Sequence, residues 1–395
     1  MCLLITLVLC DLAISAVNPL KFIKNYDYMP LSQNPLVSKI PRFLKEKNNP
    51  DILVMGSSLP MKAISACDHE YAHSVDNNTI EDVRRYTEAR YLRDNLRSLL
   101  QEKGQDKRIN DLEVYNLTIA GSMASDTKLL LSKALREHKR PRMVIYGVAP
   151  RTFMDNTVSK DEKTAVWQIL SKWRNLGDFV DSRLSSAERR DLMIANFWNF
   201  YRDRMDYQTF ILGYACNKLD RSPTIYAAKQ RAAAEAAGKD AAESTSASAA
   251  TPVTKTANST KSASASEQHQ NPEVLQKDLA LYDVRYNPPD FKQFDAQKSH
   301  LKEILSICKN KGIKLLVVAM PITEQNRALL DRTLYQRYLE EIPALTLSQG
   351  GSFLNLDDGN TNSIADFEDS VHTNSRGGKK VHDRLVQSIK KNQWL

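Results

Sequence analysis

The stretch 51–59, Asp-Ile-Leu-Val-Met-Gly-Ser-Ser-Leu, decides the fold. Four apolar residues in a row, ended by a glycine and two serines, are typical of a short strand that is buried on both faces of a parallel sheet. Similar short runs recur at 112–117, 142–147, 313–320 and 352–356. Because longer helical segments alternate with these runs, we predict a three-layer α/β/α domain with a doubly wound, mainly parallel sheet.

The segments with helical composition complete this pattern. They span 80–102, 125–138, 299–311, 324–341 and 376–391. A further segment between the third and fourth strands, 160–220, is rich in tryptophan, phenylalanine, tyrosine and arginine. We expect it to be helical and to cap one end of the sheet.

Residues 226–275 differ in composition from everything around them. The segment consists mostly of alanine, serine, threonine and lysine and has almost no large apolar side chain. Such a chain buries too little apolar surface to offset the entropy lost on ordering, so we expect a disordered insert. The insert would divide one domain into a first half at 51–225, which includes the helical cap, and a second half at 276–395.

The sequence begins with an apolar segment at 1–17, which is followed by Lys21 and Lys24. We interpret residues 1–24 as a signal or membrane-anchor segment and residues 25–50 as a linker. Two features oppose this interpretation: Asp11 would be expensive inside a bilayer, and no basic residue precedes the apolar run. The alternative is an apolar helix that packs on the domain.

The chain is basic, with a formal net charge of +8 at pH 7 over 395 residues. A positive surface favours contact with an anionic membrane or an acidic polymer. The lysines and arginines are scattered and are not interleaved with aromatic residues, so we expect no nucleic-acid binding. The five cysteines form no Cys-x-x-Cys pair, and neither a zinc site nor a disulfide framework is predicted.

In an open parallel sheet, the reactive groups lie at the carboxyl ends of the strands. The first predicted strand is followed by Gly56-Ser57-Ser58, and the second is followed by Gly121. A serine at a strand-to-helix turn can present its hydroxyl to a substrate, with backbone N–H groups nearby to hold an oxyanion. Ser58 is therefore the candidate nucleophile.

A catalytic serine needs a base, and the sequence has only seven histidines. His372 is preceded three residues earlier by Asp369, in a loop before the last predicted helix. A carboxylate at this spacing can hold the imidazole in the tautomer that accepts the serine proton. Ser58, Asp369 and His372 form the candidate triad, and Asn374 is a candidate substrate-binding residue. This chemistry requires no metal and no organic cofactor.

The order of these blocks resembles the SGNH (GDSL-like) hydrolase superfamily. The resemblance runs from residue 51 to about 389 without the insert, and its third block begins at Gly147 after the third strand. It implies that Ser58 is the nucleophile, that His372 is the base and that Asp369 orients the base. It also implies that the backbone N–H groups of Ser58 and Gly121 form the oxyanion hole.

Two positions depart from the superfamily's pattern. Ser57 stands in place of the usual aspartate of the first block, and Ala149 stands where the third block, usually Gly-x-Asn-Asp, has its asparagine. The loss of one oxyanion donor costs on the order of a hundredfold in rate. Arg151 could replace that donor, grip an anionic substrate or acyl carrier, or serve as an ordinary structural arginine.

The Gly-Ser-Ser form, Pro150, Met320-Pro321 and the apolar N-terminus are similar to one membrane-anchored branch of the superfamily. That branch includes the D-alanyl transfer protein of teichoic-acid modification and the alginate O-acetylation proteins. The resemblance implies a location at the extracytoplasmic face of the cell envelope, either anchored or secreted. The implied partners are an envelope glycan or acylated polymer, a membrane-bound acyl donor protein and the cytoplasmic membrane.

Three functions remain open from the sequence. The first is an extracytoplasmic serine esterase or O-acyltransferase that uses the triad. The second is a catalytically inactive binding or scaffold protein of envelope assembly on the same fold, which the missing asparagine favours. The third, a nucleotide-binding α/β protein, is disfavoured because Gly56-Ser57-Ser58-Leu59 has one glycine and no following lysine.

Overall fold

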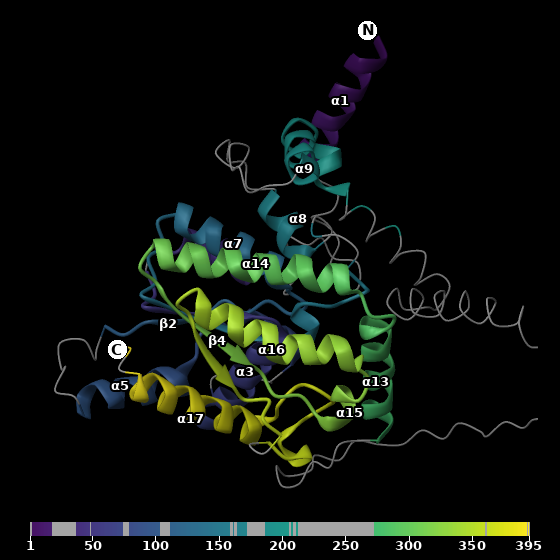
Figure 1. Cartoon of the computed structure of the whole chain (residues 1–395). Helices are drawn as coiled ribbons and strands as arrows, with labels where there is room; N and C mark the ends of the chain where they lie inside the picture. Colours follow the sequence, from purple (N-terminus) through teal and green to yellow (C-terminus); the bar gives the residue numbers. More distant parts are fainter. Residues whose placement is uncertain are drawn as a thin grey trace, which may run out of the picture.

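A computed structural model gives the arrangement of most of the chain (Figure 1). It describes residues 2–17, 37–47, 49–73, 79–102, 111–158, 161, 164–171, 186–204, 207, 211, 272–359, 362–392 and 394. Residues 226–271 of the expected insert lie outside these ranges, so the expectation of disorder there stays a prediction from composition.

A five-stranded sheet with all strands parallel forms the centre of the domain. The strands are β1 (Ile52–Gly56), β2 (Val114–Asn116), β3 (Met143–Val148), β4 (Lys314–Ala319) and β5 (Ser352–Asn355). Their spatial order is β2-β1-β3-β4-β5. The central pair runs in register from Ile52 opposite Met143 to Gly56 opposite Gly147. Every residue of β1 and β3 is buried, as the continuous apolar runs require. All five predicted strands are confirmed.

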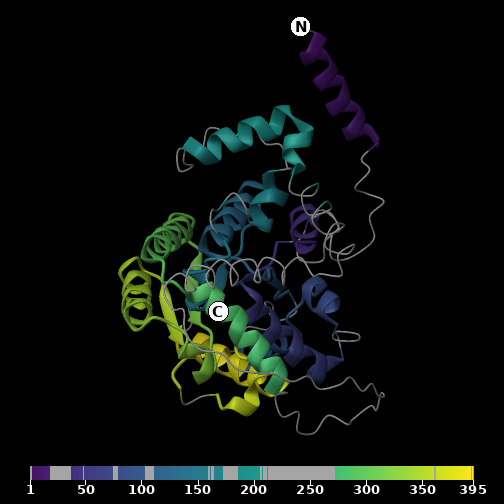
Figure 2. The ribbon, with the colours of Figure 1, turned by 90° about the vertical axis from the view of Figure 1, so that its right-hand side faces the viewer.

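Helices cover both faces of this sheet (Figures 1 and 2). One face carries α7 (Ala124–Arg136), α14 (Phe291–Asn310) and α16 (Arg332–Ser348). The other face carries α3 (Ser58–Ala72), α5 (Arg90–Glu102) and α17 (Ser375–Lys391). The chain moves from β1 to β2 in one direction and then to β3, β4 and β5 in the other, so right-handed crossovers must place the helices on opposite faces. The predicted three-layer, doubly wound α/β/α fold is confirmed.

The predicted linker at 25–50 is partly wrong, because it contains a core helix. Helix α2 (Lys39–Lys45) places Ile40 and Phe43 in the main hydrophobic core. Lys39 is buried as well, and its Nζ donates to the carbonyl oxygen of Thr118 at 3.4 Å. Burial lowers the pKa of Lys39 to about 7. This part of the segment therefore belongs to the domain.

The predicted end of the insert is also corrected. Helix α13 (Pro272–Tyr286) begins four residues before the predicted start of the second half at 276, so residues 272–275 belong to the domain. Tyr282 and Tyr286 on this helix are buried in the main core. The helix packs beside α15 (Glu324–Arg327).

The segment 160–220 is helical where it is described, but its position differs from the prediction. Helices α8 (Ala165–Ser171), α9 (Ser186–Phe197) and α10 (Asn199–Arg202) lie beyond α7, on the side away from the sheet (Figures 1 and 2). Thr164, just before α8, donates its hydroxyl to Asp126 on α7. The segment therefore extends a helical layer and does not cap an end of the sheet.

The apolar N-terminal residues form helix α1 (Cys2–Val17), which projects from the domain beside α9 and α10. None of the helices in the described ranges combines the length and the apolar character needed to cross a membrane.

Candidate active site

Ser58, His372 and Asp369 lie in hydrogen-bonding contact, as the sequence predicted. The Oγ of Ser58 is 2.8 Å from Nε2 of His372. The Nδ1 of the same ring is 2.6 Å from Oδ2 of Asp369. When the Nδ1 proton is donated to the carboxylate, Nε2 is left to accept the hydroxyl proton of Ser58. The arrangement is that of a nucleophile, a base and an orienting acid.

A sharp turn at the end of β1 presents Ser58. Gly56 has a φ of +137°, and a Cβ at this position would stand 2.5 Å from the carbonyl oxygen of Gly147, so only glycine fits. Ser57 is extended and buried, and Ser58 is the first residue of α3. A first-turn N–H group has no acceptor inside its helix, so the N–H of Ser58 can serve an oxyanion.

The carboxylate of Asp369 is held by two backbone donors in addition to the imidazole. Its Oδ1 accepts from the N–H groups of Val371 at 2.9 Å and His372 at 2.7 Å. Burial acts to raise the pKa of Asp369, but the hydrogen bond and charge of His372, together with the backbone donors, outweigh it and lower this pKa. The carboxylate is therefore ionised at neutral pH, as an orienting acid must be.

The loop that carries the base is fixed by residues that the sequence did not single out. Ser370 donates to Asp278 on α13 through its N–H at 3.1 Å and through its hydroxyl. Asn326 on α15 donates its Nδ2 to the Ser370 hydroxyl at 2.9 Å, and Thr323 donates its own hydroxyl to the Ser370 carbonyl at 2.8 Å. Burial raises the pKa of Asp278, and the neighbouring Asp369 adds to that effect. Two helices therefore lock the base in position.

The loop after β2 lies against the end of β1. The N–H of Ile119 and the hydroxyl of Ser122 donate to the carbonyl oxygen of Gly56 at 2.9 and 3.0 Å. Between these two donors, Gly121 has a φ of +80°, which favours glycine. The two residues predicted to form the oxyanion hole, Ser58 and Gly121, therefore belong to loops that meet at one strand end.

Arg151 crosses the carboxyl end of β1. It follows β3, yet its Nη2 lies 3.7 Å from where a Cβ on Gly121, after β2, would stand. Because β1 lies between β2 and β3, the guanidinium passes in front of the strand that presents Ser58. Arg151 is 8% exposed, and its Nη2 pairs with Asp155 at 2.6 Å. Its Nε is buried without a hydrogen-bond partner among the described residues.

The turn after β3 explains how the chain accommodates Ala149 in place of an asparagine. The N–H of Ala149 donates to Oγ1 of Thr152 at 3.0 Å, which closes a short 3-10 helix at Pro150–Thr152. The Ala149 side chain is buried in the hydrophobic core. This turn brings a guanidinium, not an amide, to the strand end.

Tyr282 on α13 also lies near the triad, and the sequence reasoning missed it. It is buried, and burial is the main cause that raises its pKa. The charges of Arg151, Asp278 and Asp369 are among those that act on its hydroxyl, so the phenol lies near both the arginine and the orienting acid. Asp278, Tyr282 and Tyr286 are spaced four residues apart and so share one face of a helix, which is the signal that could have revealed them.

Asn374, predicted to bind substrate, has a structural role instead. Its Oδ1 accepts from the N–H of Gly377 at 3.1 Å, so it forms the N-cap of α17. Its Nδ2 donates to the carbonyl oxygen of Ala365 at 2.8 Å. An asparagine directly before a helix is a preferred cap, which explains its place in the sequence.

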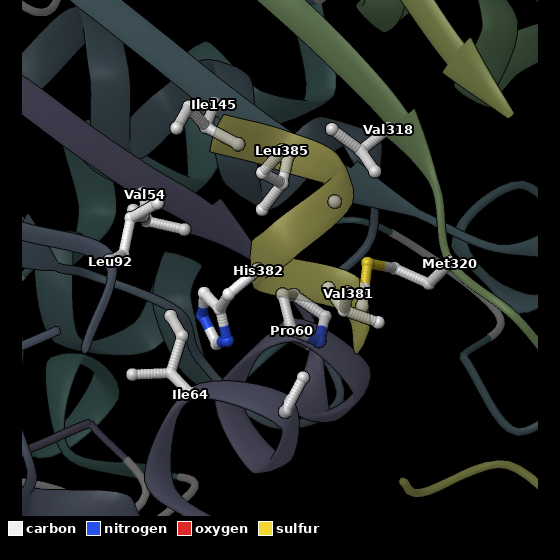
Figure 3. Close-up of a pocket in the computed structure, with 12 residues that line it drawn as sticks. Val54, Pro60, Ile64, Leu92, Ile145, Val318, Met320, Val381, His382 and Leu385 are labelled. Carbon is white, nitrogen blue, oxygen red and sulfur yellow. The ribbon is translucent and has the colours of Figure 1, made fainter. Parts of the chain in front are cut away.

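A small apolar cavity lies in the core between the sheet and helices α3 and α17 (Figure 3). Its volume of about 20 Å³ holds no more than one water molecule, so it is too small to bind a substrate. His382 is the only titratable residue that lines it, and its Nδ1 is 2.8 Å from the carbonyl oxygen of Gly378. Burial lowers the pKa of His382, which favours a neutral ring.

No curated protein matches this sequence. A family model described as "Protein of unknown function (DUF1574)" matches residues 99–387. The matched range includes Gly121, Arg151, Asp369 and His372 and begins after Ser58. Because this range covers well over half of the chain, the protein belongs to the family described as "Protein of unknown function (DUF1574)".

Proposed function

We propose that this protein is a serine esterase or O-acyltransferase of the SGNH kind. The observation that carries the proposal is the continuous hydrogen-bonded chain from Ser58 through His372 to Asp369. A half-buried, ionised carboxylate at one ring nitrogen and a serine hydroxyl at the other are what nucleophilic acyl chemistry requires. The strand order β2-β1-β3-β4-β5, with the serine at the end of the strand where the order reverses, supports the same assignment.

The first half of the reaction forms an acyl-enzyme. The Ser58 oxygen attacks the acyl carbonyl carbon while Nε2 of His372 takes the hydroxyl proton. The tetrahedral intermediate then collapses, the bond between the carbonyl carbon and the leaving oxygen breaks, and the imidazolium returns the proton to the leaving alcohol. In the second half, water or an acceptor hydroxyl loses its proton to His372 and attacks the acyl carbon. The bond between the acyl carbon and the Ser58 oxygen then breaks, and the imidazolium returns the proton to that oxygen.

The developing oxyanion is stabilised by the N–H groups of Ser58 and Gly121 in this proposal. The guanidinium of Arg151, whose Nη2 reaches the Gly121 loop across the end of β1, supplies the side-chain donor that Ala149 does not. A charged donor in a water-poor site stabilises a developing negative charge strongly. The Nε of Arg151 supports this role, because it is buried and has no hydrogen-bond partner among the described residues, and a bound substrate would give it one in this proposal.

The substrate we propose is an acylated cell-envelope glycan or related polymer, handled outside the cytoplasmic membrane. The resemblance of the blocks to the membrane-anchored SGNH branch, the apolar helix α1 and the net charge of +8 support this location. A reporter that works only outside the cytoplasm should then be active when it is fused after Leu395. Activity confined to a cytoplasmic reporter would contradict the envelope location and leave the chemistry unaffected.

The second candidate function is a scaffold or binding protein of envelope assembly. The observation that favours it is Ala149, which removes the asparagine donor from the third block. In this alternative, the protein keeps the arrangement of Ser58, His372 and Asp369 but does not catalyse a reaction.

A fluorophosphonate probe separates the two functions. The probe reacts only with an activated serine, and mass spectrometry of the labelled peptide identifies the residue. The enzyme proposal expects stoichiometric label on Ser58 of the full chain. Absence of label on Ser58 in folded protein would exclude the enzyme and leave the scaffold.

A further inference from the structure

Among the residues that the structure describes, nine of the sixteen exposed large hydrophobic residues lie on two short pieces of chain, which concentrates them on one part of the surface. Five lie on α1: Ile5, Val8, Leu9, Leu12 and Val17. Four lie on α9, α10 or the residue between them: Met193, Ile194, Trp198 and Phe200. Both views show α1 and α9 together, projecting from the domain on the side opposite α17 (Figures 1 and 2).

A single buried carboxylate joins the two pieces. Asp11 is the only charged residue of α1 and is 8% exposed. Its oxygens accept hydrogen bonds from the N–H of Phe200 at 2.6 Å, the N–H of Asn199 at 3.1 Å and the Asn199 side-chain amide at 2.9 Å. The one charge of the apolar helix is thus satisfied by the chain itself.

The second piece is in turn fastened to the domain. Asp191 on α9 accepts hydrogen bonds from the Trp167 ring nitrogen on α8 at 3.1 Å and from the Tyr201 hydroxyl at 2.8 Å. Arg204 pairs with the same carboxylate at 2.5 Å and stacks on the Tyr201 ring at 3.9 Å. Asp191 therefore connects the segment that carries these exposed apolar side chains to α8.

We infer that α1, α9 and α10 together form a module that embeds in a phospholipid bilayer. Apart from Thr6, Asp11 and Ser15, α1 is apolar on every face. A protein partner or a second copy would cover one face of such a helix, whereas lipid surrounds it on all sides. Trp198 and Tyr201 suit the level of the lipid headgroups, where amphipathic rings gather.

The headgroups that fit this module are anionic. Arg189 and Arg190 on α9 are exposed, and the whole chain carries a net charge of +8. Arginines beside inserted apolar side chains strengthen binding to negatively charged lipid. The hydrogen bonds to Asp11 explain why an acidic residue can stand in the middle of a lipid-binding helix. Burial of a hydrogen-bonded carboxylate costs far less free energy than burial of an unpaired one.

The test uses the full chain in vesicles of phosphatidylcholine and phosphatidylglycerol whose acyl chains carry bromine, which quenches tryptophan on contact. Wild-type fluorescence should be quenched, Trp198→Phe should remove that quenching, and Trp394→Phe, which changes a tryptophan near the C-terminus, should retain it. Arg189→Glu with Arg190→Glu should weaken vesicle binding on the order of tenfold or more. Equal quenching of the wild type and Trp198→Phe, or no binding to vesicles, would overturn the inference.

A second pair of variants tests the hydrogen bonds between Asp11 on α1 and the start of α10. Asp11→Leu should leave the chain bound to vesicles through α1 but reduce the quenching of Trp198, because α10 loses the acceptor for its first N–H groups. Ala13→Leu adds a similar apolar group at an exposed position of α1 and should leave the quenching unchanged. If both variants behave like the wild type, or if lipid-free protein forms a dimer that Trp198→Ser dissociates, a bilayer is not the partner of this surface.

Discussion

Gly378 on α17 packs directly against the carbonyl oxygen of Ala63 on α3. A Cβ on Gly378 would stand 2.4 Å from that oxygen, so the backbones of the two helices approach as closely as atoms permit. Ser58 begins α3, and His372 lies three residues before α17 begins. This contact therefore fixes the distance between the candidate nucleophile and its base, although neither glycine nor alanine takes part in the chemistry.

Gly378→Ala should separate the two helices. Alanine in a helix interior is normally favoured over glycine by about 1 kcal/mol, so a gain in stability would be the ordinary result. Here the added methyl group meets backbone, and we expect a loss of about 1–3 kcal/mol, measured by denaturant unfolding. The labelling rate of Ser58 should fall on the order of tenfold or more, because the serine and the imidazole move apart.

Gln387→Ala, an exposed change on the same helix, is the matched control and should preserve both stability and labelling. A Gly378→Ala protein more stable than the wild type would show that the close contact is not required.

The triad variants should separate the three roles. Ser58→Ala and His372→Ala should abolish labelling by a fluorophosphonate, because each removes an atom that bonds or moves the proton. Asp369→Asn should keep the fold but slow labelling by roughly 10³–10⁴-fold, because an amide can stabilise the wrong tautomer of the imidazole. Ser57→Ala, one residue away, should label at close to the wild-type rate. Undiminished labelling of His372→Ala would rule out the base.

Arg151→Met tests the guanidinium at the end of β1. If Arg151 stabilises the oxyanion, the rate of acyl-enzyme formation should fall on the order of 10²–10³-fold with little change in KM. If it grips an anionic part of the substrate, KM should rise instead.

Arg285→Met is the control for Arg151→Met. Arg285 pairs with the same Asp155 at 2.7 Å, so its loss disturbs the same buried carboxylate. We expect a comparable loss of stability and an unchanged rate. Equal losses of rate in the two variants would mean that Arg151 acts only through the fold.

The strands and the triad could be predicted because their signals are local. Buried parallel strands are continuous apolar runs, and Gly56, Ser58, Asp369 and His372 stand directly at predicted ends of elements. The order of the sheet then brings these ends together, which is a property of right-handed crossovers.

The features that could not be predicted from the sequence depend on contacts between distant residues. The predicted helix 80–102 is in fact two, α4 (Ile80–Arg85) and α5. The second begins where Asp68 on α3 accepts hydrogen bonds from the N–H groups of Arg90 and Tyr91, at 2.6 and 2.8 Å. A cap supplied from 22 residues away leaves no trace in the local pattern. Helix α13, which carries Asp278, was not predicted for a similar reason. It follows a low-complexity segment, and only its contacts with distant residues identify it as part of the domain.

Asp126, near the start of α7, should make the stability of the protein depend on pH. The carboxyl group is 2% exposed and accepts hydrogen bonds from the Thr164 hydroxyl and from the N–H of Met123 at 3.0 Å. Burial, the largest influence, raises its pKa from 3.8 to about 7, against the effect of these hydrogen bonds. Between pH 3.8 and about 7, the folded chain therefore holds a proton on Asp126 that the unfolded chain has released.

Since the pKa is higher in the folded state, the stability that Asp126 contributes is complete below pH 3.8 and is lost as the pH rises through about 7. Asp126→Asn mimics the protonated form at every pH. Relative to this variant, the wild type should lose stability between pH 5 and pH 8, by an amount on the order of a few kcal/mol, in denaturant melts at each pH.

For Asp161→Asn, the stability difference from the wild type should change with pH in the opposite direction. This variant therefore controls for a general effect of removing a carboxylate. Burial acts to raise the pKa of Asp161, but His300, whose Nε2 is 2.9 Å away, outweighs it and lowers this pKa. The stability that Asp161 contributes is therefore present above its unfolded pKa and is lost in acid, so Asp161→Asn should be less stable than the wild type at pH 7, and the difference should shrink below about pH 4. If the stability difference between the wild type and Asp126→Asn is the same at pH 5 and pH 8, Asp126 does not carry a proton in the folded state.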